Sequence, residues 1–115
     1  MVEVSLKWAE PARVLLEQDG QDWIGLWMLL DAAGHAAFAL SLAAPLGAGV
    51  DLAFAAIELG EARDEVEWLH EHLAEQPPVR LGPLHVSDNL DDARRVVEQL
   101  VDAATARTLR LIDEA

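Results

Sequence analysis

The chain has 115 residues, of which 21 are Asp or Glu and 8 are Lys or Arg, so its formal net charge is −13, and yet 52% of its residues are hydrophobic. Disordered acidic tails combine high charge with low hydrophobicity, so this composition instead predicts a folded protein with a strongly negative surface. Its length fits a single domain, residues 1–115. The absence of cysteine excludes a disulfide framework, a thiolate zinc site and a cysteine nucleophile.

The distribution of charge along the chain also bears on location and partners. Residues 1–4 lack the basic region followed by an apolar stretch that is typical of a signal peptide. The longest charge-free stretch, residues 32–50, contains three glycines and a proline and makes a poor membrane span. Proteins bind phosphate groups through clustered Lys and Arg, whereas this chain has a net charge of −13. We therefore expect no binding to nucleic acid or membranes. We expect a cytoplasmic, bacterial protein.

The first segment of the chain is predicted to form two short strands. Apolar and polar residues alternate from Val2 to Trp8, which is the period of a half-buried strand. Pro11 ends this run, and residues 13–17 form a second short candidate. Residues 18–21 then supply the residue types of a turn.

Residues 23–44 allow two interpretations. As strands, they form runs at 23–30 and 37–43 around a turn at 31–34, because Phe38, Leu40 and Leu42 alternate with smaller residues. As a helix, they would begin after a cap at Asp22 and end before Gly34, and their many alanines favour helix. We favour strands, because the alternation is regular and the spacing of the turns suits a meander.

Two helices are predicted in the rest of the chain. The first covers residues 51–75, where an apolar residue recurs every three or four positions: Leu52, Ala55, Leu59, Ala62, Val66, Leu69 and Leu73. The second begins at a cap within residues 87–89 and has a stripe of its own: Ala93, Val96, Val97, Leu100, Val101 and Ala104. Residues 79–86 form a plausible strand between them, and residues 108–112 either extend the second helix or form a final strand.

Taken together, these elements predict one α+β domain. An N-terminal antiparallel β-meander packs against a long acidic helix, and a short strand and a C-terminal helix follow. The alternative is an all-α bundle with an N-terminal hairpin.

The predicted helix at 51–75 carries an uneven acidic load. Seven carboxylates and one arginine, Arg63, lie between residues 58 and 76. Like charges three or four residues apart on a helix repel, so a helix selected for stability alone would intersperse lysines. We interpret this face as a binding surface for a basic protein partner; the alternative is a solvated face that keeps the protein soluble. The predicted contact residues are Glu61, Asp64, Glu65, Glu67 and Glu71.

The remaining motifs point to chemistry only weakly. Glu67 and His70 have the Glu-x-x-His spacing of di-iron bundles, but the pair occurs once, and exposed helix residues are the simpler reading. No catalytic residue, metal site or cofactor is predicted. Four tryptophans without tyrosine are unusual; beyond core packing, Trp23, Trp27 and Phe38 are candidates to line an apolar pocket or a subunit interface.

These observations lead to two hypotheses about function. The first is a non-enzymatic, acidic interaction module that binds or inhibits a basic protein, as an immunity protein or antitoxin does. The alternative is a homo-oligomer that binds a small ligand, or acts as an enzyme, through a tryptophan-lined pocket. We also expect a homodimer, because the charge-free stretch at 32–50 exposes apolar surface that a second copy would bury.

Overall fold

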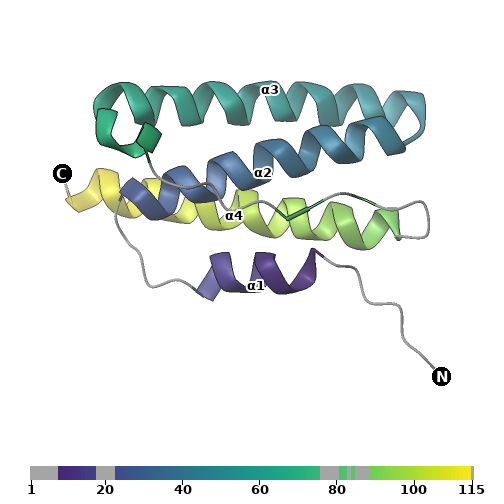
Figure 1. Cartoon of the computed structure of the whole chain (residues 1–115), viewed down its shortest axis with the longest axis horizontal. Helices are drawn as coiled ribbons and strands as arrows, with labels where there is room; N and C mark the ends of the chain where they lie inside the picture. Colours follow the sequence, from purple (N-terminus) through teal and green to yellow (C-terminus); the bar gives the residue numbers. More distant parts are fainter. Residues whose placement is uncertain (1–7, 18–22, 76–80, 83, 85–88, 115) are drawn as a thin grey trace.

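The computed structural model describes residues 8–17, 23–75, 81–82, 84 and 89–114, and these are helical apart from short connecting segments. The elements are α1 (Ala9–Glu17), α2 (Trp23–Ala43), α3 (Leu46–Leu69), the short 3-10 helix η1 (Glu71–Glu75) and α4 (Leu90–Glu114). α2 packs against α3 on one side and α4 on the other, and α1 lies along α4 (Figure 1). α3 is therefore an edge helix of this all-α fold.

The predicted α+β fold is wrong, and the error lies mainly in residues 23–44. The described residues contain no strand, and this segment forms the single helix α2. Leu40 is buried, whereas Phe38 and Leu42 lie four residues apart on an exposed side of that helix. Their alternation with small residues therefore reflects two sides of a helix, and the high helix propensity of the alanines dominates.

The predicted N-terminal strands are also not observed in the described part of the chain. Residues 1–7 lie outside it, and residues 13–17 belong to α1. Pro11 occupies the first turn of α1, where its missing N–H would have had no partner within the helix. Trp8 is fully buried, and its Nε1 donates a hydrogen bond to the Gly82 carbonyl over 2.9 Å. Of the predicted strand at 79–86, only residues 81, 82 and 84 are described, and none of these is in a strand.

The two predicted helices are present with altered boundaries. α3 begins at Leu46, five residues before the predicted start, and gives way to η1 after Leu69. Gly49 makes this early start possible, because the first turn of α3 passes very close to the end of α2. A Cβ added at position 49 would lie only 2.7 Å from the Ser41 carbonyl oxygen. α4 is capped by Asn89, whose Oδ1 accepts from the Asp91 N–H over 2.9 Å. It runs without interruption to Glu114, so residues 108–112 are helical.

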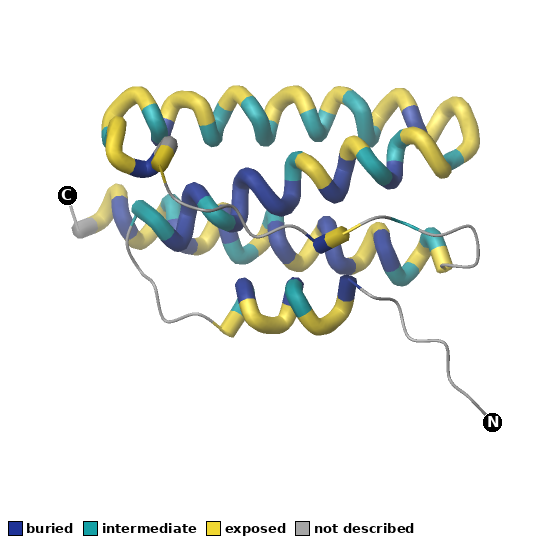
Figure 2. Tube along the Cα trace, viewed as in Figure 1, coloured by how far each residue is buried: buried dark blue, intermediate teal, exposed yellow. Residues whose placement is uncertain are grey.

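The core is centred on α2, and the tube in Figure 2 shows how unevenly the helices are buried. Eleven of the 21 residues of α2 are buried, whereas α3 has only two buried residues, Gly49 and Val66. α2 is also the one described helix long and apolar enough to cross a membrane by length and composition. A central core helix passes the same test, and α2 has more than half of that span buried inside the protein.

Candidate functional site

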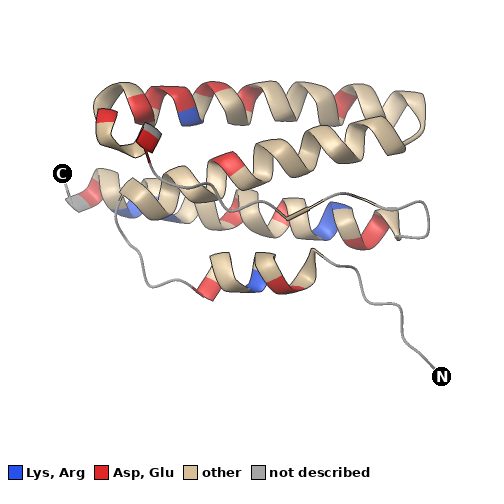
Figure 3. Ribbon diagram, in the orientation of Figure 1, with Lys and Arg blue, Asp and Glu red and all other residues tan. Residues whose placement is uncertain are grey.

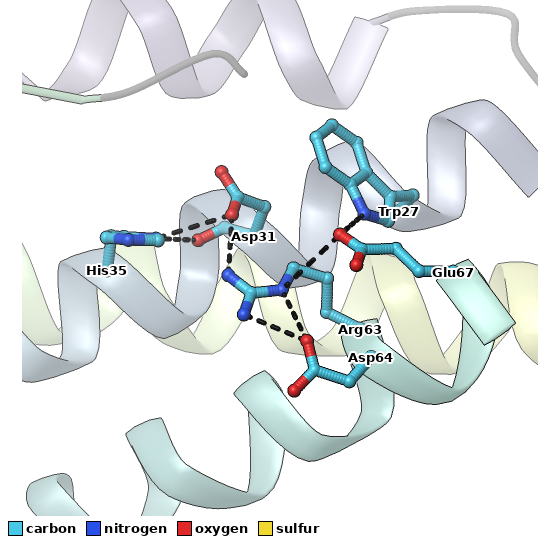
Figure 4. A network of polar contacts seen from close by, with 6 residues as sticks. All are labelled: Trp27, Asp31, His35, Arg63, Asp64 and Glu67. Atoms are coloured by element: carbon cyan, nitrogen blue, oxygen red, sulfur yellow. Dashed lines mark hydrogen bonds and ion pairs between the residues drawn. The ribbon is translucent and has the colours of Figure 1, made fainter. Parts of the chain in front are cut away.

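A polar network joins α2 to α3 inside the helix pair (Figure 4). The Asp31 side chain is 3% exposed, and its Oδ1 accepts a hydrogen bond from Arg63 Nη1 over 2.9 Å. His35 Nδ1 lies 3.5 Å from the same oxygen. Arg63 also donates to Asp64 Oδ1, from Nη2 over 3.0 Å and from Nε over 3.2 Å. The lone arginine of the acidic helix thus compensates a buried carboxylate of the neighbouring helix.

The environment of Arg63 keeps its guanidinium charged. Burial acts to lower the pKa of Arg63, but hydrogen bonds and charge from Asp31 and Asp64 outweigh it and raise the pKa above its ordinary value. Arg63 donates to Asp31 across the two helices while Asp64 of its own helix holds the rest of the guanidinium, and this arrangement fixes α2 and α3 in register. We therefore assign this network a structural role.

Two tryptophans of α2 hold the C-terminal part of α3. Trp27 is buried, and its Nε1 donates to Glu67 Oε1 over 2.7 Å. Trp23 stacks on the His70 ring, with the ring centroids 4.9 Å apart. Each member of the Glu-x-x-His pair thus contacts a different tryptophan. No group of three or more His, Asp or Glu side chains in the described residues could hold a metal ion.

The hydrogen bond from Trp27 can be tested by removing its donor. The variant Trp27→Phe should lower the free energy of unfolding by about 1 kcal/mol, since hydrogen bonds to charged groups contribute more than neutral ones but Glu67 keeps some access to water. Trp68→Phe is the matched control, because Trp68 is 82% exposed and its replacement should leave stability unchanged. Urea denaturation measures both, and equal effects would contradict this role for Trp27.

An exposed side of α3, which borders its contact with α2 at Ile57, forms a second feature that we call the outward face of α3. Its members recur every three or four residues and therefore lie on one side of the helix, and all are exposed. They are Leu46, Val50, Phe54, Ile57, Glu61, Asp64 and Trp68. The first four form an apolar half, and the last three form an acidic half that ends in a tryptophan.

The acidic half contains two of the five predicted contact residues, Glu61 and Asp64, and two more are exposed close to it in the chain. Glu61, Asp64 and Glu65 are exposed on α3, and Glu71 is exposed on η1. Figure 3 shows carboxylates gathered along this end of α3 and on η1. Glu67 differs from the other four, because its carboxylate is held by Trp27 inside the helix pair. The structure therefore brings four of the five residues to one end of the molecule's surface.

The residues predicted to line a tryptophan pocket are not brought together. A cavity of about 380 Å³ lies between α2 and α3, and Phe38, Ile57, Gly60 and Arg63 are among its lining residues. Neither Trp23 nor Trp27 lines it. Eleven residues separate Phe38 from Trp27, which is roughly 16 Å along a helix. The two tryptophans serve the contact between α2 and α3 instead.

Two residues of functional interest were not predicted. Trp68 is 82% exposed, although a tryptophan is usually well buried. Its position on the side of the helix opposite the predicted apolar stripe is a sequence signal for this exposure. Asp31 was assigned to a turn, and its pairing with Arg63 depends on the register of two helices that no local pattern reveals.

Comparison with known proteins finds no relative: no family model, curated protein or solved structure matches the chain. What the protein does is therefore inferred from its own side chains.

Proposed function

We propose that this protein is a non-enzymatic interaction module that binds a basic protein partner through the acidic half of the outward face of α3. The observation that carries the proposal is Trp68, which is 82% exposed on the same side of α3 as Glu61 and Asp64. So exposed a ring buries little apolar surface within this chain and adds little to its stability. It is the kind of residue that anchors a protein interface when a partner covers it.

The surroundings of Trp68 define the chemistry of that partner. Asp64 and Glu65 lie four and three residues before Trp68, within reach on the helix surface, and Glu71 is exposed on η1 just beyond the end of α3. An arginine or lysine of the partner would lie over the indole face and pair with these carboxylates. An arginine-rich helix or loop fits this surface best.

The overall charge of the chain also favours a basic partner. A net charge of −13 attracts a basic partner at long range and accelerates association, most strongly at low ionic strength. A small acidic protein that covers a basic surface is suited to inhibit the protein that carries it, as immunity proteins and antitoxins do. This inhibitory role is part of the proposal.

The proposal is tested with the partner that a pull-down from the native host recovers. The variant Glu61→Gln, Glu65→Gln, Trp68→Ala should associate with that partner at least tenfold more slowly at low salt, since it loses both attraction and anchor. The control variant Asp102→Asn, Asp113→Asn also removes two negative charges, but from exposed positions of α4, and should associate almost normally. Equal association rates for the two variants would contradict the proposed surface.

A further inference from the structure

We propose that the apolar half of the outward face of α3 is the interface with a second copy of this chain. The two α3 helices pack antiparallel across a twofold axis that passes between Val50 and Phe54. This surface is separate from the acidic half to which we assign the basic partner.

The apolar half exposes several large hydrophobic side chains next to one another on α3. Leu46 is 85% exposed, Phe54 62% and Ile57 56%. α3 makes its main contacts with α2 and η1, so no described helix covers this side. Phe38 of α2 extends the patch, because it lines the same cavity as Ile57, and the exposed Leu42 lies one helical turn beyond Phe38 on the same side of α2. The patch thus spans two neighbouring antiparallel helices.

Its area fits a dimer interface. The six apolar side chains, including two phenylalanines, expose roughly 100 Å² each, or roughly 600 Å² in total. That is at the upper limit of the largest apolar patch on a typical monomer, and close to the roughly 800 Å² per partner of a stable interface.

The spacing of the patch is suited to helix pairing. Leu46, Val50, Phe54 and Ile57 follow one another at intervals of four, four and three residues. Such a seam packs knobs-into-holes against an equivalent seam. Two copies of the pair α2–α3 would then form a four-helix arrangement around a shared apolar interface.

Charge decides the direction of packing. In a parallel pair, Glu61 and Asp64 of one copy would lie beside the same residues of the other and repel them. In an antiparallel pair, each apolar half covers the other apolar half, and the acidic halves lie at opposite ends. Charge also favours a second copy over a basic partner at the apolar half. Asp51 is the only charged residue between 46 and 57, so this surface offers a basic partner little to pair with.

The antiparallel dimer leaves the acidic half of each copy free. Trp68 lies 16 residues from the axis, which is roughly 24 Å along the helix. The assembly would therefore present two equivalent acidic surfaces at its two ends.

The dimer is tested by measuring the mass of the full chain by sedimentation over low to high micromolar concentration. The chain has a mass of 12.5 kDa, and the expected species has twice that mass. The variant Phe54→Gln, Ile57→Gln should weaken dimerisation at least tenfold while the helical circular dichroism stays unchanged. The control Leu109→Gln, Ile112→Gln changes two residues of α4 that are each 60% exposed and should remain dimeric. A monomer mass for the wild type at every concentration would overturn the proposal, and would leave the basic-partner surface untouched.

The direction of packing has its own test, made possible by the absence of native cysteine. A mixture of Val50→Cys and size-tagged Phe54→Cys chains should form a covalent mixed dimer under mild oxidation. Asp64→Cys chains alone should stay uncrosslinked, because antiparallel packing separates these positions. Crosslinking at Asp64→Cys, or its absence from the mixed pair, would overturn the antiparallel interface.

Discussion

Replacing Arg63 with methionine should lower the free energy of unfolding by about 3 kcal/mol. The Asp31 carboxylate that Arg63 compensates is only 3% exposed, and breaking a buried ion pair by removing one partner is strongly destabilising. Because the Arg63 side chain is 26% exposed, water can enter in its place and the loss should be at the lower end of the range for buried pairs. Urea denaturation followed by circular dichroism measures the change.

Two further variants distinguish the buried ion pair of Arg63 with Asp31 from its exposed ion pair with Asp64. Asp64→Asn removes the other carboxylate that binds Arg63, but its side chain is 63% exposed and the loss should stay below about 1 kcal/mol. In the double variant Asp31→Asn, Arg63→Met, the destabilisation should be clearly smaller than the sum of the single effects, since both remove the same interaction. A loss for Arg63→Met no larger than that for Asp64→Asn would contradict the structural role of the network.

Replacing Gly49 with alanine should lower the free energy of unfolding by about 2 kcal/mol. The added Cβ would lie 2.7 Å from the Ser41 carbonyl oxygen, which belongs to the backbone of α2 and cannot rotate away. The α2–α3 turn would have to open, at a cost typical of overpacking that outweighs the better helix propensity of alanine.

Gly60→Ala is the matched control for Gly49→Ala. Gly60 also lies within α3, but a Cβ there meets nothing within 4 Å. Alanine should therefore stabilise the protein by about 0.5 to 1 kcal/mol through helix propensity alone. Thermal and urea denaturation of both variants should give changes of opposite sign. Stabilisation by both would show that the close approach at Gly49 is absent.

How far the sequence predicts this fold depends on how each helix is buried. α4 and the central part of α3 have one apolar stripe each, and the three- and four-residue periodicity located both. α2 is apolar on nearly every side, because α3 and α4 both pack against it and its exposed side also carries Phe38 and Leu42. Periodicity cannot distinguish such a helix from buried strands, so the alternation from Phe38 to Leu42 predicts a strand where the structure has a helix.

The candidate site was predictable only in part for a related reason. The acidic load of residues 58–75 is evident from composition, and the exposure of Glu61, Asp64 and Glu65 follows from the position of the apolar stripe. The inward position of Glu67 depends on the register between α2 and α3, which places Trp27 opposite it. Tertiary register of this kind is not encoded in any local spacing.

The most direct test of the proposed binding surface follows the tryptophan indole N–H signals by NMR while an arginine-rich peptide is added to the full chain. The chain has only four such signals, and single Trp→Phe variants assign them. The signal of the exposed Trp68 should shift saturably at low salt and much less at high salt, because the attraction is screened. The signal of Trp8, whose side chain is buried and donates to the Gly82 carbonyl, should stay in place. A stationary Trp68 signal, or equal shifts of Trp68 and Trp8, would contradict the assignment of the acidic half of α3 as the binding surface.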